Sequence, residues 1–136
     1  MKYTVIIGCG RLGANLAGTL SSNGESVTII DKTDFVFKKL PPTYSGMVKV
    51  GDGTDISVLK DVDVGNANAV IVVTNNDNIN IFIAQLAKEY FKISQVIARL
   101  YDPDKELVYK EFGIDTISPA LLSVKEISQI LGRTQC

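Results

Sequence analysis

A glycine-rich turn near the N-terminus carries the strongest chemical signal in this sequence. Gly8, Gly10 and Gly13 follow an apolar run in the spacing G-x-G-x-x-G, and a helical pattern begins directly after them. The first glycine permits a tight turn, the second lets a phosphate approach the backbone, and the third lets the helix pack closely on the strand. The unpaired N–H groups at the start of such a helix favour an anion. The turn therefore predicts a site for a phosphate group.

Asp31 is the second candidate, because it ends a β-branched run close to the separation of about 20 residues that follows this turn in dinucleotide-binding domains. A carboxylate there can accept hydrogen bonds from both hydroxyls of an adenosine ribose, and it would repel a 2′-phosphate. Together with the glycine turn, Asp31 predicts NAD or an adenine nucleotide in preference to NADP. Taken alone, it could equally be a solvated aspartate at a strand end.

Five further residues are candidates with equally ordinary alternatives. Asp52 and Gly53 follow a third apolar run, where an adenine ring would lie, but they also suit a plain turn. Thr74 follows the fourth run and could face phosphates or cap a helix. Arg99 ends the fifth run, and Arg11 lies inside the glycine turn. Either arginine could neutralise phosphate charge, or lie on the surface as most single arginines do.

Catalytic chemistry has little support. The chain contains no histidine, which excludes histidine triads, histidine acid–base schemes and histidine metal sites. Cys9 is interpreted as a small side chain and not as a redox thiol, although a helix N-terminus can lower a thiol pKa. Tyr101 and Lys105 have the Tyr-x-x-x-Lys spacing of the catalytic pair in short-chain dehydrogenases. The helix expected from Asp102 begins after the tyrosine, so the two side chains do not share a helical face.

Size and composition set the broad class. A chain of 136 residues with 46% apolar and 21% charged residues is most consistent with one globular domain. The formal charge of −1 leaves no broad basic field for nucleic acid or an acidic membrane. No apolar run reaches the length of a membrane helix, and no signal peptide is expected. Cys9 and Cys136 do not resemble a disulfide framework, so we expect a reducing cytoplasm.

The order of the elements predicts the fold. Strands are expected at 3–7, 26–30, 47–50, 69–73, 95–99 and 115–117. Helices are expected at 11–22, 33–40, 55–60, 77–91, 102–112 and 119–131. In the fourth of these, Ile79, Phe82, Ile83 and Leu86 are expected to face inward. Because strand and helix alternate with short connections, right-handed crossovers give an α/β fold of Rossmann type. Its doubly wound, six-stranded parallel sheet has the order 3-2-1-4-5-6, with the ligand where strands one and four diverge.

Several stretches taken together resemble a known family, the RCK N-lobe, also called TrkA-N or KTN. This lobe belongs to regulatory proteins of Trk/Ktr-type potassium-uptake systems and to gating rings of potassium channels. The resemblance covers essentially the whole chain. It is carried by the glycine turn 8–13, Asp31, the segment 51–55, the strand and turn at 70–74, and most specifically by the segments 96–103 and 112–119.

The resemblance implies a nucleotide sensor and not an enzyme, with no catalytic or metal-binding residues. NAD(H) or ATP/ADP would be the ligand. The implied binding residues are Gly8, Cys9, Gly10, Arg11, Leu12 and Gly13 for the phosphates, Asp31 for the ribose, Asp52 and Gly53 on the adenine side, and Thr74 and Arg99 to complete the pocket. Arg11 occupies a position from which some relatives direct an arginine towards nucleotide phosphates at a dimer interface.

The resemblance also implies an organisation and partners. Residues 1–118 would form the nucleotide-binding lobe, and residues 119–136 the crossover helix that pairs subunits, with its tail. A core-covering helix is the alternative for this segment.

The second, C-terminal lobe of full RCK subunits is absent, and Ala120 stands where many relatives carry an acidic residue. The expected assembly is a homodimer within a larger ring, bound to a membrane-embedded potassium transporter or channel subunit. It would lie in the cytoplasm at the inner face of the cell membrane, with no direct membrane insertion and no nucleic acid.

Two other functions remain open at this point. One is the cofactor domain of an NAD-dependent oxidoreductase, which the missing substrate domain and missing histidine disfavour. The other is a purely structural assembly lobe whose nucleotide pocket no longer works.

Overall fold

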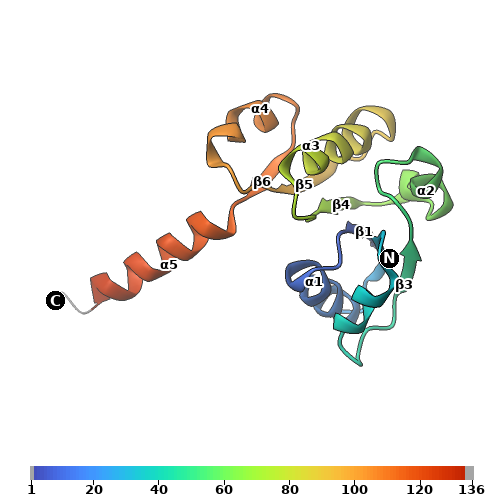
Figure 1. Ribbon diagram of the computed structural model, residues 1–136, viewed down its shortest axis with the longest axis horizontal. Helices are drawn as coiled ribbons and strands as arrows, with labels where there is room; N and C mark the ends of the chain where they lie inside the picture. The colour runs from blue at the N-terminus through green and yellow to red at the C-terminus, as the bar shows by residue number, and fades with distance from the viewer. Residues whose placement is uncertain (1, 134–136) are drawn as a thin grey trace.

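A parallel sheet of six strands forms the centre of the computed structural model, which describes residues 2–133. The strand order is β3-β2-β1-β4-β5-β6, as the sequence predicts (Figure 1). The strands are β1 (Tyr3–Ile7), β2 (Ser26–Asp31), β3 (Met47–Val50), β4 (Ala69–Val72), β5 (Gln95–Arg99) and β6 (Asp115–Ile117). The central strands are almost fully buried, as expected for a sheet with a hydrophobic core on each face.

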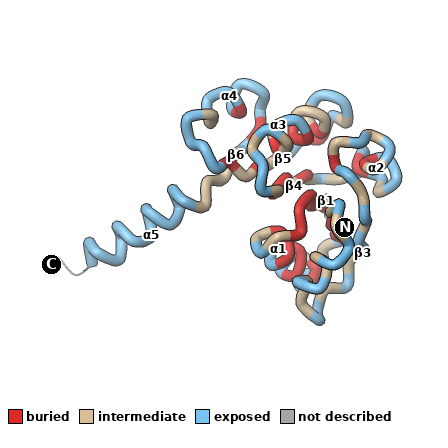
Figure 2. The backbone as a smooth tube through the Cα atoms, in the orientation of Figure 1, coloured by how far each residue is buried: buried red, intermediate tan, exposed pale blue. Residues whose placement is uncertain are grey.

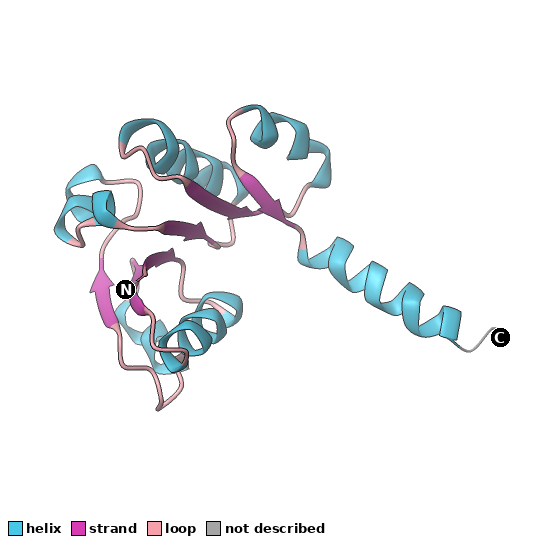
Figure 3. Ribbon diagram, turned by 180° about the vertical axis from the view of Figure 1, so that it is seen from behind, coloured by secondary structure: helices cyan, strands magenta, loops and turns pink. Residues whose placement is uncertain are grey.

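Helices cover both faces of this sheet, as the view from behind also shows (Figure 3). The helices are α1 (Arg11–Ser22), η1 (Asp34–Lys39), α2 (Ile56–Asp61), η2 (Val64–Asn66), α3 (Asp77–Gln85), η3 (Leu86–Tyr90), η4 (Pro103–Lys105), α4 (Glu106–Glu111) and α5 (Pro119–Arg133). One core lies between the sheet and α1 with η1, and the other between the sheet and α2, α3 and α4. Successive residues of a central strand, such as Ile6 and Ile7 of β1, enter opposite cores.

The connections out of β1 and β4 lead to opposite faces of the sheet. From β1 the chain enters α1, whereas from β4 it enters α3 (Figure 1). The Gly8 N–H donates to the Ile30 carbonyl at 2.8 Å, and the Val73 N–H donates to the Ile7 carbonyl at 2.8 Å, so pairing continues to the point of divergence. A crevice between the two connections is the usual ligand position in such sheets.

Two glycines allow the close approach of α1 to the turn after β1. Gly8 has a φ of +109°, and a Cβ atom there would lie 2.8 Å from the Val73 carbonyl oxygen. A Cβ atom on Gly13 would collide with the carbonyl oxygen of Gly8. The helix therefore approaches the turn to a distance that only glycine permits.

Two expected helices differ in detail from the observed ones. The segment expected to form a helix at 33–40 is a 3₁₀ helix, and the Thr33 side chain makes no capping hydrogen bond to it. The helix expected to 91 ends its α-helical part at Gln85 and finishes as a π-helix. Phe82, expected to face inward, is 48% exposed, because Asn80, Ile83 and Ala84 occupy the buried face of α3.

The C-terminal helix α5 stands away from the sheet. Figure 2 shows it exposed along its length, and none of its described residues is buried. Its apolar side chains are each about half exposed or more: Leu121, Leu122, Val124, Ile127, Ile130 and Leu131. The alternative of a core-covering helix is therefore wrong. No helix within residues 2–133 has the length and apolar character needed to cross a membrane.

The contact between Gly13 and Gly8 predicts a large cost for one added methyl group. Changing Gly13 to Ala should lower the free energy of unfolding by about 3 kcal/mol, since backbone must move to relieve the collision. Urea denaturation measures this value. Gly65→Ala is the matched control, because a Cβ atom on Gly65 meets nothing within 4 Å. Equal stability of the two variants would contradict the close packing of α1 on the turn.

Candidate functional site

A cavity of about 350 Å³ opens at the carboxyl ends of the strands, in the crevice between the connections from β1 and β4. This volume lies in the usual range for small-ligand sites. Its walls come from the turn after β1, the end of β2 with the loop beyond it, the turn after β3, the loop after β4 and the end of β5.

The cavity brings together most of the residues that the sequence singles out. Those in its lining are Gly8, Cys9, Gly10, Asp31, Asp52, Gly53, Thr74 and Arg99. The other three do not line it: Arg11 and Leu12 begin α1, and Gly13 packs against the Gly8 carbonyl. Arg11 is exposed beside the cavity, on the first turn of the helix.

Asp31 joins the end of β2 to the glycine turn. Its Oδ2 atom accepts a hydrogen bond from the Cys9 N–H at 2.8 Å, and its Oδ1 atom accepts one from the Thr33 N–H at 3.0 Å. Each carboxylate oxygen has a second lone pair, so both can still accept a hydrogen bond from a ligand hydroxyl. The carboxylate is half-buried at the cavity wall, where such hydroxyls would meet it.

Gly10 and Cys9 differ in what they offer the cavity. Gly10 lines it, and the space that a Cβ atom would occupy there is open, so a ligand can approach the backbone. The Cys9 side chain is buried, and its thiol donates to the Val36 carbonyl at 3.6 Å. Burial, and next the charge of Asp31, raise the pKa of this thiol, so it stays protonated and suits packing better than redox chemistry.

Asn80 fixes the loop after β4, although the sequence analysis does not single it out. This side chain is completely buried and accepts from both the N–H, at 3.0 Å, and the hydroxyl of Thr74. Its amide nitrogen donates to the carbonyls of Thr74 and Arg99, at 3.1 and 3.0 Å. These hydrogen bonds fix the position of Thr74. The sequence contains one indication of this role, because Asn80 is a polar residue on the otherwise apolar inward face of its helix.

Arg99 lies at the end of β5, on the far side of the cavity from Asp31. Its Nη2 atom donates to the Thr74 carbonyl at 2.6 Å. Its Nε atom is buried and has no hydrogen-bond partner among residues 2–133. A buried donor without an acceptor is costly, so this atom is suited to an acceptor that a ligand supplies.

Hydrogen bonds between its own residues hold the turn after β3. The Oδ1 atom of Asp52 accepts from the Thr54 N–H at 2.9 Å and from the Thr54 hydroxyl at 2.7 Å, and these bonds lower the pKa of Asp52. That arrangement is the plain turn considered as the alternative for Asp52, although the residue also lines the cavity. A Cβ atom on Gly53 would lie 2.7 Å from the Ile7 side chain, so glycine lets this turn reach the cavity.

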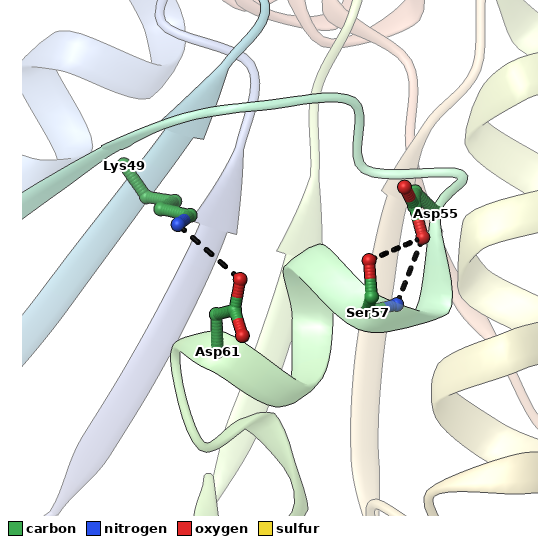
Figure 4. A network of polar contacts seen from close by, with 4 residues as sticks. All are labelled: Lys49, Asp55, Ser57 and Asp61. Carbon is green, nitrogen blue, oxygen red and sulfur yellow. Dashed lines mark hydrogen bonds and ion pairs between the residues drawn. The ribbon is translucent and has the colours of Figure 1, made fainter.

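The segment that follows is anchored to the sheet edge (Figure 4). Asp55 caps α2 by accepting from the Ser57 N–H at 2.9 Å and the Ser57 hydroxyl at 2.8 Å. An ion pair of 3.4 Å between Lys49 of β3 and Asp61 joins the other end of α2 to the sheet. Both links lie near the surface and are individually weak, but together they fix the helix that follows the turn.

The electrostatics of the cavity suit an anion that carries hydroxyl groups. Besides Arg99, its lining includes two cations that the sequence analysis does not single out, Lys32 and Lys39, beside the carboxylates of Asp31 and Asp52. No group of His, Cys, Asp and Glu side chains able to hold a metal ion occurs in the part of the chain that the structure describes. The arrangement can bind phosphate and sugar groups, but it presents no histidine for acid–base catalysis.

Comparison with known proteins gives a family match over most of the chain. The family model described as the TrkA-N domain matches residues 4–119. The Trk system potassium uptake protein TrkA of Streptomyces coelicolor is 37% identical over 85% of this chain and 52% of its own length. A TrkA homolog of Methanothermobacter thermautotrophicus is 35% identical over 96% of this chain and 61% of its own length. The chain thus spans about half to three fifths of these relatives.

Solved structures share the fold at lower identity. The TrkA-N domain of the inner membrane protein ybaL from Escherichia coli has a TM-score of 0.85 at 16% identity, covering 96% of both chains. The GsuK channel bound to NAD and the GsuK bound to ADP each have a TM-score of 0.72 at 18% identity. They cover 85% and 86% of this chain and 21% and 31% of those chains. At these identities the likeness establishes the fold alone.

The Asn80 network predicts a stability defect. Changing Asn80 to Ala leaves the Thr74 N–H and the Arg99 carbonyl without their buried partner, so the free energy of unfolding should fall by about 3 kcal/mol. Asn78→Ala, at an exposed position of the same helix, should change it by less than about 0.5 kcal/mol. Urea denaturation compares the two, and a neutral Asn80→Ala would show that the network does not hold the loop.

Proposed function

This chain belongs to the TrkA-N domain family, and on that premise we propose that it is a regulatory domain that binds an adenine nucleotide to control potassium transport. The cavity at the divergence of β1 and β4 carries the proposal. It combines a glycine turn open to a phosphate, the Asp31 carboxylate with lone pairs available to a ligand, and a buried Arg99 donor that has no partner among the described residues 2–133. These are the groups that a nucleotide needs.

Each part of the nucleotide has a proposed position. Gly8, Cys9 and Gly10 would bind the phosphates through the backbone, with the start of α1 supplying its partial positive charge. Asp31 would accept hydrogen bonds from the ribose hydroxyls. The turn at Asp52 would lie beside the adenine, and Thr74 with Arg99 would meet the part of the ligand farthest from it.

The ligand is proposed to be NAD(H) or ATP/ADP. The GsuK channel has been solved with NAD and with ADP, which supports an adenine nucleotide in general. Asp31 would recognise the ribose that these ligands share, so it does not separate them. Bound NAD would act here as a signal and not as a hydride carrier, because the cavity lining presents no histidine that could serve as an acid or base in the transfer.

Regulation would arise from a shift in population between conformations. A nucleotide changes the state of an assembly only if it binds the two conformations with different affinities. We propose that the exposed apolar face of α5 joins two copies of the chain, and that this dimer is part of a ring on a transporter or channel at the cytoplasmic face of the membrane. Arg11, exposed beside the cavity, would direct its charge towards nucleotide phosphates at such an interface.

Isothermal titration with NADH, NAD, ATP and ADP tests the nucleotide half of this proposal. The chain should bind at least one of them, and Asp31→Ala should weaken binding about tenfold through the lost ribose hydrogen bonds. Asp34→Ala is the matched control, since Asp34 is a nearby exposed carboxylate outside the cavity lining. Thermal unfolding confirms that each variant is folded.

Absence of binding by all four nucleotides would refute nucleotide sensing. Unchanged affinity in a folded Asp31→Ala variant would refute the ribose assignment alone. Turnover of NADH in the presence of a reducible substrate would instead favour the oxidoreductase.

The assembly half predicts that one charge on α5 separates the copies. Ile127→Glu should convert the dimer to a monomer without unfolding the lobe, because Ile127 is 57% exposed and α5 contributes no buried residue. Gln129→Glu adds the same charge on the opposite side of the helix and should leave the dimer intact. Light scattering coupled to size exclusion measures both masses, and a monomeric parent chain or a dimeric Ile127→Glu would contradict this interface.

A further inference from the structure

Arg99 is held between two groups at the end of β5. Its Nη2 atom donates to the Thr74 carbonyl at 2.6 Å, and its guanidinium carbon lies 4.9 Å from the centre of the Tyr101 ring. A cation over an aromatic face at this distance is attracted by the ring. The planar guanidinium is therefore fixed by the hydrogen bond that it donates to the loop after β4 and by its contact with the ring of Tyr101.

Tyr101 is itself held by the start of α3. The carboxylate of Asp77 accepts from the Tyr101 N–H at 2.8 Å and from the Asp102 N–H at 2.9 Å. The Tyr101 side chain is 53% exposed, so it adds little to the hydrophobic core, and it does not line the cavity. Its clearest contact is the one with Arg99, which makes it a positioning residue for that guanidinium.

The position of Arg99 in the sheet sets which ligands it can reach. β5 is separated from β2 by β1 and β4, so the ends of these strands lie three strand spacings apart. At about 4.8 Å a spacing, the span from Asp31 to Arg99 is roughly 14 Å. A ribose with a single phosphate is shorter than this span. A triphosphate, or a pyrophosphate carrying a second nucleoside, extends much farther along it.

We propose that Arg99, positioned by Tyr101, makes the cavity selective for adenine nucleotides that extend well beyond the first phosphate. The inference rests on the nucleotide binding proposed above. A ligand with its ribose at Asp31 and an acceptor group near β5 receives hydrogen bonds from Arg99, whose buried Nε atom has no partner within residues 2–133. AMP leaves that donor unsatisfied. The selectivity therefore follows ligand length and not the adenosine that all these ligands share.

Isothermal titration with AMP, ATP and NAD, on the full chain and its variants, tests this selectivity. The parent chain should bind ATP or NAD more tightly than AMP. Arg99→Gln should weaken binding of that longer ligand about tenfold, the loss expected for a hydrogen bond from a charged group, and leave AMP unchanged. Tyr101→Leu should weaken the same ligand about threefold, and Tyr101→Phe, which keeps the aromatic face, should restore it.

Tyr90→Leu is the matched control for Tyr101→Leu. Tyr90 is 52% exposed and has a cation, Lys60 Nζ, 5.7 Å from its ring centre, but it lies outside the cavity lining. Its substitution should leave every affinity unchanged. Equal losses for AMP and the longer ligands in Arg99→Gln, or no loss in Tyr101→Leu, would overturn the proposed selectivity while nucleotide binding stands. A parent chain that binds none of the three would overturn both proposals.

Discussion

The close packing of α1 on the turn after β1 is the constraint on which the site depends. Gly13 brings the helix against the Gly8 carbonyl, and Gly8 itself has a positive φ that directs the chain from the sheet into the helix. With a larger residue at either position, the helix would move away from the strand. The N–H groups at its start would then no longer meet the cavity, and the hydrogen bond from Cys9 to Asp31 could not keep its length of 2.8 Å. One backbone contact thus positions both the glycine turn and the Asp31 carboxylate of the candidate site.

The rest of the site is fixed by polar groups that satisfy one another. The Asn80 side chain accepts a hydrogen bond from the Thr74 N–H, and the Thr74 carbonyl accepts one from Arg99. The Asp77 carboxylate accepts one from the Tyr101 N–H and so fixes the turn that carries this tyrosine. Because these contacts use the backbone of two loops, they tie together the part of the cavity wall formed after β4 and β5. What remains available to a ligand is then a small set: the glycine turn, the Asp31 lone pairs and the donors of Arg99.

The sequence predicts the sheet well because its signals are local. Short apolar runs alternate with helical patterns, and Gly8, Gly13 and Asp31 mark the crevice through their spacing. The role of Asn80 could not be predicted from local patterns, because only the fold brings its partners at the ends of β4 and β5 next to it. Phe82 misleads for a related reason: an apolar side chain at helical spacing is expected inward, but here it is exposed. The exposure of α5 could not be read from its amphipathic pattern, since a helix that covers a core has the same pattern.

The central claim is that an adenine nucleotide occupies the crevice between β1 and β4. Its most direct test is the change in backbone amide chemical shifts of the isotope-labelled chain on titration with NADH or ATP. The account predicts saturable shifts at Gly8, Cys9 and Gly10, at Asp31 and at Thr74, with the far end of α2 unaffected. Shifts confined to another surface, or no shifts with either nucleotide, would contradict it.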